Sequence, residues 1–202
     1  MLLLGGCGFV GRHLVALLVK AGVAKIRVVD KLMPAMAFLT PEHKEAFAMP
    51  AVEYKQADIS KPAGVDKAFE GGGFDFVFNL TYDAITYGET DEVYQQRIVD
   101  VVTRVGMAAK QHGVKRFVDL STAQVYDSKE KASDESATLK PWTKQAVFKL
   151  RAEAILRDVP GLPLVVLRAA SVYGPADVHG LSPRVLCAAV YKHLGEKMKF
   201  AW

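Results

Sequence analysis

The glycine-rich run that follows the first four residues is suited to binding a phosphate group. It reads Gly5-Gly-Cys-Gly-Phe-Val-Gly11, so Gly5, Gly8 and Gly11 recur at every third position. Glycines at this spacing let a chain turn tightly after a strand, approach a pyrophosphate closely and pack the next helix near the sheet. That helix would direct free N–H groups and the positive end of its dipole at the anion. We therefore predict a dinucleotide site built on Gly5, Gly8, Phe9, Val10 and Gly11.

An acidic residue stands where the ribose of such a dinucleotide would lie. Asp30 ends the run Ile26–Asp30, 19 residues beyond Gly11. A carboxylate at this place accepts both hydroxyls of the adenosine ribose and repels a 2′-phosphate, so the pattern favours NAD over NADP. Lys31 adjoins Asp30 and would offset part of that repulsion. The alternative interpretation of Asp30 is an ordinary loop residue after a strand.

Alternating strands and helices would position these residues. Apolar runs predict strands at Met1–Leu4, Ile26–Asp30, Val52–Gln56, Phe74–Leu80, Lys115–Leu120 and Leu164–Arg168. Three- and four-residue periodicity predicts helices at Phe9–Ala21, before Gly71–Gly73, at Glu89–His112 and at Trp142–Asp158, whereas the segment between the second and third strands is interpreted as a connection. Nearly all-apolar strands separated by helices predict an α/β fold, a doubly wound parallel sheet of the Rossmann type.

The alternation weakens after the sixth predicted strand. We expect an NAD-binding domain at 1–175 and only the beginning of a C-terminal substrate lobe at 176–202. Within that lobe, Leu181–Leu194 is predicted to form a helix and Met198–Trp202 to begin a strand.

Charge and cysteine usage argue against several other classes of protein. The 202 residues carry 26 Lys and Arg and 22 Asp and Glu, a net charge of +4, and the two signs are interleaved. No apolar stretch approaches the ~20 residues of a membrane span, and Cys7 and Cys187 lie far apart without metal-ligand spacing. We expect no nucleic-acid partner, no membrane insertion and no metal. We expect the protein in the cytoplasm or in an organellar matrix such as the mitochondrial one, and we do not expect it to be secreted.

Several motifs in the same order resemble the extended short-chain dehydrogenase/reductases, the NAD-dependent epimerase/dehydratase family of nucleotide-sugar enzymes. The glycine run is similar to the family's G-G-x-G-F-[IV]-G, and Ala57-Asp58-Ile59 to its adenine-binding segment. Ser121-Thr122-Ala-Gln-Val-Tyr126 resembles the segment of the catalytic Ser or Thr, and Leu167-Arg-Ala-Ala-Ser-Val-Tyr-Gly-Pro175 the segment after the sixth strand. The resemblance covers nearly the whole chain.

The resemblance implies roles for individual residues. Thr122 would hydrogen-bond the reacting oxygen, and Lys149 would bind the nicotinamide ribose. The alternatives are that Thr122 satisfies loop backbone groups and that Lys149 is a solvated charge on its helix. Further cofactor contacts implied in this way are Asp58, Ile59, Leu80, Thr81 and Ala170.

One position departs from the family's catalytic pattern. The family places Y-x-x-x-K on the helix after the fifth strand, and counting back four residues from Lys149 gives Gln145. A carboxamide neither accepts nor donates a proton near neutral pH, so hydride-plus-proton chemistry would lack its proton carrier. In addition, Asn79-Leu-Thr-Tyr82 stands where relatives commonly show His-Leu-Ala-Ala, and Arg97 lies near a position where they keep Asn.

These observations favour an NAD(H)-binding family member whose oxidoreductase or epimerase chemistry is weakened or lost. A first alternative is an active epimerase, dehydratase or reductase of a nucleotide sugar or similar polar alcohol, with a substitute base such as Tyr126. A second alternative is a non-catalytic structural subunit of a larger assembly, and a weaker one is a fold without nucleotide whose glycine turn is blocked by Tyr82. The resemblance also suggests a homodimer paired through the two long helices.

Overall fold

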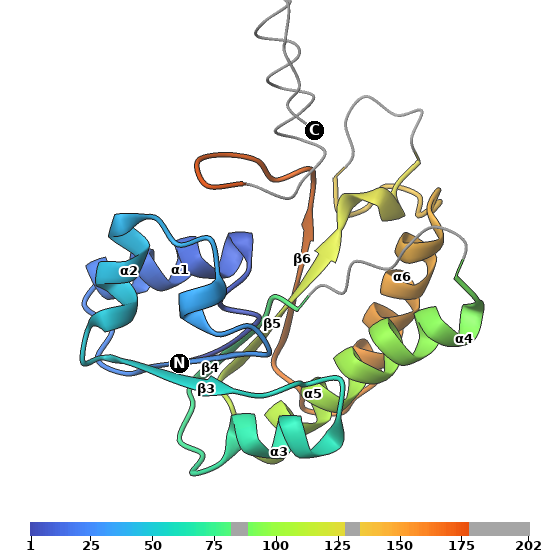
Figure 1. Cartoon of the computed structure of the whole chain (residues 1–202). Helices are drawn as coiled ribbons and strands as arrows, with labels where there is room; N and C mark the ends of the chain where they lie inside the picture. The colour runs from blue at the N-terminus through green and yellow to red at the C-terminus, as the bar shows by residue number, and fades with distance from the viewer. Residues whose placement is uncertain (82–88, 128–133, 178–202) are drawn as a thin grey trace, which may run out of the picture. The chain divides into compact units, whose positions relative to one another are not determined.

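Figure 1 shows the computed structural model of the chain, which describes residues 1–81, 89–127 and 134–177. Met1–Ala170 forms one compact unit, and Ser171–Trp202 is a second. The strands of the first unit are β1 (Leu2–Leu4), β2 (Ile26–Asp30), β3 (Val52–Gln56), β4 (Phe76–Asn79), β5 (Arg116–Thr122) and β6 (Leu164–Ala169).

The six strands form one sheet in the order β3-β2-β1-β4-β5-β6, and every neighbouring pair is parallel. The chain moves outward from β1 in one direction as far as β3 and then restarts on the other side of β1 with β4. In sheets of this kind, ligands bind outside the carboxyl ends of the two strands at which the order reverses, and here these strands are β1 and β4. The sequence-based prediction of a doubly wound parallel sheet is confirmed.

Helices cover both faces of the sheet (Figure 1). One face carries α1 (Phe9–Lys20) and α2 (Pro41–Ala48), and the other carries α3 (Pro62–Phe69), α5 (Val101–Gln111) and α6 (Lys144–Arg157). A helical turn α4 (Asp91–Tyr94) and a π-helical segment η2 (Gln95–Asp100) lead into α5, while η1 (Pro34–Met36) and η3 (Ala123–Val125) are single 3₁₀ turns. No helix in the described part of the chain is long and apolar enough to cross a membrane.

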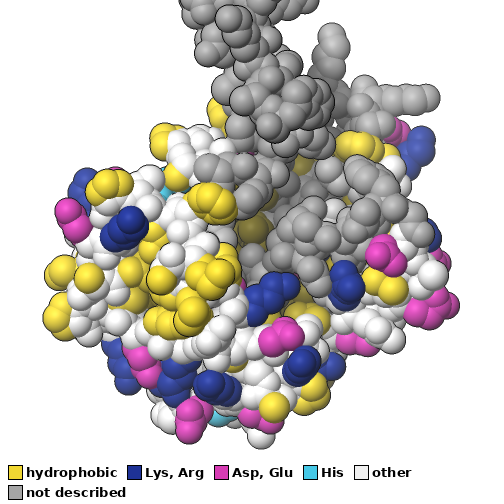
Figure 2. Space-filling view, in the orientation of Figure 1, with side chains coloured by type: hydrophobic (Ala, Val, Ile, Leu, Met, Phe, Trp, Pro, Cys, Tyr) yellow, Lys and Arg dark blue, Asp and Glu magenta, His cyan; other side chains and the backbone are white. Residues whose placement is uncertain are grey.

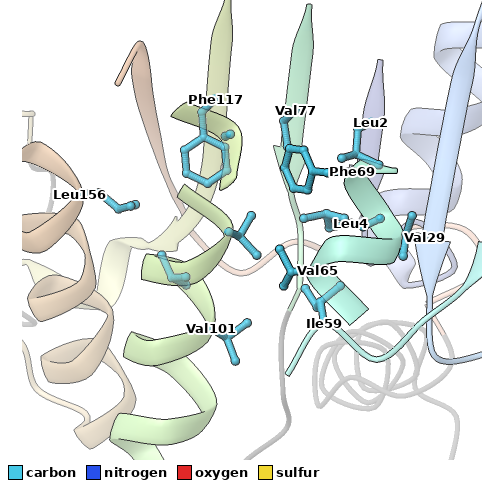
Figure 3. Close-up of a cluster of buried hydrophobic side chains, with 14 of the residues drawn as sticks. Leu2, Leu4, Val29, Ile59, Val65, Phe69, Val77, Val101, Phe117 and Leu156 are labelled. Atoms are coloured by element: carbon cyan, nitrogen blue, oxygen red, sulfur yellow. The ribbon is translucent and has the colours of Figure 1, made fainter. Parts of the chain in front are cut away.

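A hydrophobic core lies on each side of the sheet. Leu2 and Leu4 point to the side of α3, α5 and α6, where they pack with residues such as Phe69 and Phe117 (Figure 3). Leu3 points to the other side, toward α1 and α2. Burial on both faces explains why β1 is a continuous run of leucine rather than an alternating pattern.

The element bounds agree with the predictions for most of the first unit, with β2 and β3 matching to the residue. The interpretation of the segment between them as a plain connection is wrong, because it contains η1 and α2. α2 begins with a capping box, in which the Thr40 hydroxyl accepts from the His43 N–H and His43 Nδ1 accepts from the Thr40 N–H. The single helix predicted at Glu89–His112 corresponds to three consecutive helical segments. It begins with α4, continues through η2 and ends with α5.

Several predictions concern residues beyond the described ranges. The helix at 181–194, the strand at 198–202 and the side chain of Tyr82 lie outside them. The domain boundary at 175 therefore stays a prediction beside the division after Ala170.

Candidate functional site

The glycines of the turn between β1 and α1 have little or no room for a Cβ. Gly5 has a φ of +79°, and a Cβ on it would lie 3.0 Å from the backbone oxygen of Leu80 at the end of β4. A Cβ on Gly11 would lie 2.4 Å from the oxygen of Gly5. Gly8 is the exposed N-cap of α1 and makes no side-chain capping bond, and Phe9 and Val10 follow in the first turn. The first N–H groups of α1 are thus open to an anion, as the glycine spacing predicts.

Asp30 lies directly beside this turn. One oxygen of its carboxylate accepts from the backbone N–H of Cys7 at 3.0 Å, and the other from the N–H of Leu32 at 3.0 Å. A carboxylate offers about four acceptor directions, so these two bonds leave capacity for ribose hydroxyls. Burial, aided by the Asp30 charge, raises the pKa of Cys7 to about 12, so its thiol stays neutral. The structure therefore joins the predicted phosphate turn to the predicted ribose acceptor, with exposed Lys31 following.

The segment after Asp30 presents apolar side chains to solvent. Figure 2 shows hydrophobic side chains gathered over the region between β2 and α2. Those with large exposed fractions are Leu32, Met33, Met36 and Phe38. An apolar surface therefore adjoins the acidic group at this edge of the sheet.

Asp58 and Ile59 follow β3 at the same carboxyl edge. The Asp58 carboxylate accepts from the hydroxyl and the N–H of Ser60, and the hydroxyl bond is the main cause that lowers the pKa of Asp58. Ile59 is buried. A Cβ on Gly64 would lie 1.9 Å from the backbone oxygen of Asp58, so the first turn of α3 packs tightly against this loop. The structure places this predicted adenine-binding pair one strand beyond Asp30 in the sheet.

A hydrogen-bonded chain runs from the end of β4 into the core. The Thr81 hydroxyl donates to Asn79 Oδ1 at 2.6 Å, and Asn79 Nδ2 donates to Asp119 Oδ1 at 2.7 Å. Asn79 and Asp119 are each 1% exposed. Leu80 closes the turn from the other side through its N–H, which donates to the oxygen of Leu4.

The predicted catalytic positions come from β5 and α6. Thr122 ends β5, and its hydroxyl oxygen accepts from the Gln124 N–H at 3.2 Å, which is the loop role considered as an alternative. Lys149 is 5% exposed, and its ammonium donates to the Leu120 oxygen at 2.8 Å, so the interpretation of Lys149 as a solvated charge is wrong. Gln145 lies one turn earlier on α6 and is partly buried.

A buried ion-pair network joins α6 to the carboxyl ends of β5 and β6. Glu153 is fully buried on α6, and the guanidinium of Arg168 on β6 donates to its carboxylate at 2.7 and 3.2 Å. The hydroxyl of Ser121 also donates to Glu153, and Arg168 Nη1 donates to the Tyr126 hydroxyl at 2.8 Å. The bonds to Glu153 are the main cause that holds the pKa of Arg168 above its ordinary value. The supporting role of Glu153 and Arg168 was not predicted, although Arg168 stands in the segment 167–175 that carries part of the resemblance.

Asp119 is the other member that the sequence reasoning missed. Its Oδ2 is buried and has no hydrogen-bond partner among the described residues. Burial is the main cause that raises the pKa of Asp119, while the Lys149 charge and the Asn79 bond act in the opposite direction. The available signal was a single acidic residue inside the apolar run 117–120.

Ala170 follows β6 as an exposed residue at the end of the first unit. The glycine turn, Asp30, Asp58, Thr81 and Thr122 all follow or end strands at one edge of the sheet. No group of three or more His, Cys, Asp or Glu in the described part of the chain could hold a metal ion.

Comparisons with known proteins agree with this geometry. The model of the NAD dependent epimerase/dehydratase family matches residues 1–201, which confirms the resemblance found in the motifs. The chain is 27% identical over 188 residues to YtcB of Bacillus subtilis, named as an uncharacterized UDP-glucose epimerase, and the match covers 87% of this chain and 57% of that protein. It is 30% identical over 186 residues to 3beta-hydroxysteroid-dehydrogenase/decarboxylase isoform 1 of Arabidopsis thaliana, covering 86% of this chain and 41% of that protein.

Among solved structures, the Bordetella bronchiseptica enzyme WbmH in complex with NAD⁺ superimposes with a TM-score of 0.72 at 26% identity. That match covers 96% of this chain and 62% of WbmH. The chain thus spans between two fifths and about three fifths of the length of these three proteins.

Proposed function

The chain belongs to the NAD-dependent epimerase/dehydratase family, and we propose that its first unit binds NAD(H) at the carboxyl edge of β1, β2 and β4. The observation that carries this proposal is the turn from Gly5 to Gly11, in which Gly5 and Gly11 have no room for a Cβ and the N-terminus of α1 has no side-chain cap among the described residues. Its N–H groups would hold the pyrophosphate. The site fits the coenzyme because the Asp30 carboxylate is already hydrogen-bonded to this turn.

The other residues of the edge would hold the rest of the coenzyme. Asp58 and Ile59 would contact the adenine, Leu80, Thr81 and Ala170 would line the path of the dinucleotide, and Lys149 would bind the nicotinamide ribose. The Asp30 carboxylate would repel a 2′-phosphate, so NAD is favoured over NADP. In relatives solved with NAD, such as WbmH, the shared fold supports this assignment.

We further propose that proton transfer at this site is slow. Bound NAD would supply a hydride acceptor. Thr122 keeps its hydroxyl proton for an oxygen of a substrate while it accepts from Gln124. Gln145 can orient a substrate by hydrogen bonds, but its carboxamide cannot take up a proton near neutral pH. A lost general base typically lowers a rate by ~10²- to 10⁴-fold.

Among the described residues, Tyr126 is a candidate substitute base that a specific contact favours. Its hydroxyl lies 2.8 Å from Arg168 Nη1, so a phenolate formed there would face a guanidinium. An active enzyme would then act on a nucleotide sugar or similar polar alcohol, in keeping with the name of the Bacillus subtilis relative. A non-catalytic subunit of a larger complex would bind the same coenzyme without turnover.

Thermal unfolding with and without coenzyme tests the proposal. We expect NAD and NADH to stabilise the chain, by ~2.7 kcal/mol at 100 times the dissociation constant, and NADP to do so less. Asp30→Asn should bring the stabilisation by NAD and the stabilisation by NADP closer together, because the repulsion of the 2′-phosphate is removed. The matched control Asp75→Asn changes an exposed carboxylate that precedes β4 at the other edge of the sheet, and should leave the difference intact. If none of the three coenzymes stabilises the chain, the proposal is wrong.

A further inference from the structure

Asp119 has a buried carboxyl group at a position where burying an apolar side chain would cost less free energy. It lies in β5 on the same side as Phe117 and Ser121, and its Oδ2 has no hydrogen-bond partner among the described residues. Burying a carboxyl group without full pairing costs stability. A cost of this kind is often found where a charge serves a ligand.

One hydrogen-bonded chain and one electrostatic interaction connect Asp119 to the proposed coenzyme site. The first is the chain through Asn79 to Thr81, which follows the strand end that meets the glycine turn. The second is the charge of Lys149, the residue proposed to bind the nicotinamide ribose. Asp119 therefore lies beneath the nicotinamide end of the site rather than the adenosine end, which Asp30 marks.

The charge balance beneath the site depends on whether Asp119 is ionised. The charged side chains that act on it from α6 are Lys149 and Glu153, and Glu153 is already paired with Arg168. β4 adds the neutral amide of Asn79. The buried residues of η2 and α5 carry no charge: Ile98, Val99, Val101, Val102, Val105, Gly106 and Ala109. A protonated Asp119 leaves the positive charge of Lys149 uncompensated, whereas an ionised Asp119 balances it.

We propose that Asp119 makes this site discriminate between the two redox states of its coenzyme, favouring oxidised NAD⁺ over NADH. The inference rests on the proposed function and deepens it. The nicotinamide ring is a cation in NAD⁺ and neutral in NADH. A second positive charge beside Lys149 is unfavourable unless Asp119 is ionised, and the reduced ring makes no such demand.

A pH dependence follows from the same balance. Because burial raises the pKa of the Asp119 carboxyl, binding of the cationic ring at pH values near that pKa should favour the ionised form and release a proton, and binding of the neutral ring should not. The preference for NAD⁺ therefore grows as pH rises through the pKa of Asp119.

Calorimetric titration of the whole chain with NAD⁺ and NADH measures this preference as a ratio of dissociation constants. As pH rises from about 4, the ordinary value of a carboxyl pKa, to about 8.5, we expect the NAD⁺ preference of the wild-type chain to rise. Asp119→Asn, which keeps the shape and the Asn79 contact but cannot ionise, should lower the preference about tenfold at the upper end and make it flat. Asp75→Asn is the control that should leave both features unchanged. Structural damage would weaken the binding of both coenzymes together and leave the ratio of their dissociation constants unaltered.

The outcomes separate the two proposals. If wild type binds neither coenzyme, the proposed function itself fails. If it binds both but Asp119→Asn keeps the ratio and its slope, the Asp119 inference is overturned. Should Asp119→Asn not fold, titrations of wild type in two buffers of different ionisation heat decide the matter. Greater proton release with NAD⁺ than with NADH supports the inference, and equal release across the pH range overturns it.

Discussion

At the scale of single residues, the proposed function depends most on position 145. Lys149 is buried and aligned by the Leu120 carbonyl, so the lysine half of the family's pair is held in place. The other half is a carboxamide on the preceding turn. The sequence predicted both positions, because they lie four residues apart on one helix. It could not predict Asp119, whose partner Asn79 is 40 residues away and meets it only through the β4–β5 register.

A tyrosine at position 145 should speed the proton transfer that we propose to be slow in the wild-type chain. We expect Gln145→Tyr to raise the rate of coenzyme reduction by UDP-glucose or UDP-galactose by ~10²- to 10⁴-fold, because a phenol beside a lysine is a usable base. Gln111→Tyr, at the exposed end of α5, is the control and should have no effect. Absorbance of NADH follows the reaction. A wild-type chain that already reacts as fast as Gln145→Tyr would contradict the proposed weakness.

The buried ion pair at Glu153 should dominate the stability of this end of the sheet. Glu153→Ala leaves the Arg168 guanidinium and the Ser121 hydroxyl without their buried partner, so the free energy of unfolding should fall by ~3–5 kcal/mol. Urea denaturation at neutral pH measures it. Glu45→Ala on the exposed side of α2 should change stability far less. Equal losses in the two variants would show that the network contributes little.

At the scale of elements, apolar runs and glycines were enough to predict the strands, because each strand is buried and ends at a sharp turn. α2 was missed since it has little apolar periodicity, and its buried side chains are only His43 and Ala46. Its start depends instead on a capping box closed by a histidine, a residue that sequence rules do not expect at that position. The π-helical turns of η2 were likewise not encoded in a recognisable pattern.

We expect the histidine cap to make the packing of α1 on α2 sensitive to acid. His43 Nδ1 accepts from the Thr40 N–H and its Nε2 faces His13 Nδ1 at 3.3 Å, so the neutral ring suits both contacts. Burial is the main cause that lowers the pKa of His43, followed by the charges of His13 and Arg12. A base whose pKa is lowered by folding is protonated first in the unfolded chain. Its contribution to stability is therefore full above the ordinary pKa of ~6.5 and is lost as pH falls below it.

Chemical denaturation at two pH values checks this prediction. Wild type should lose more stability than His43→Asn between about pH 7.5 and 5.5, because asparagine keeps an acceptor near Nδ1 but does not titrate. His112→Asn, an exposed histidine, is the control and should behave like wild type. Identical pH slopes for wild type and His43→Asn would count against a buried neutral ring.

At the scale of the whole molecule, the order of the strands brings together residues that are far apart in the chain. Gly5, Asp30, Asp58, Thr81 and Thr122 share one edge because all strands are parallel and their carboxyl ends coincide. That much followed from the alternation of strands and helices. Pairing through the two long helices stays a prediction, as do the compartment and the substrate, since they depend on other molecules.

A crystal structure of the chain grown with NAD would test the central claim most directly. We predict electron density for the pyrophosphate at the N–H groups of Phe9 and Val10, and for the adenosine ribose hydroxyls on the Asp30 carboxylate. Density for a bound coenzyme elsewhere, or no coenzyme density at the glycine turn and Asp30 at saturating NAD, would contradict the account.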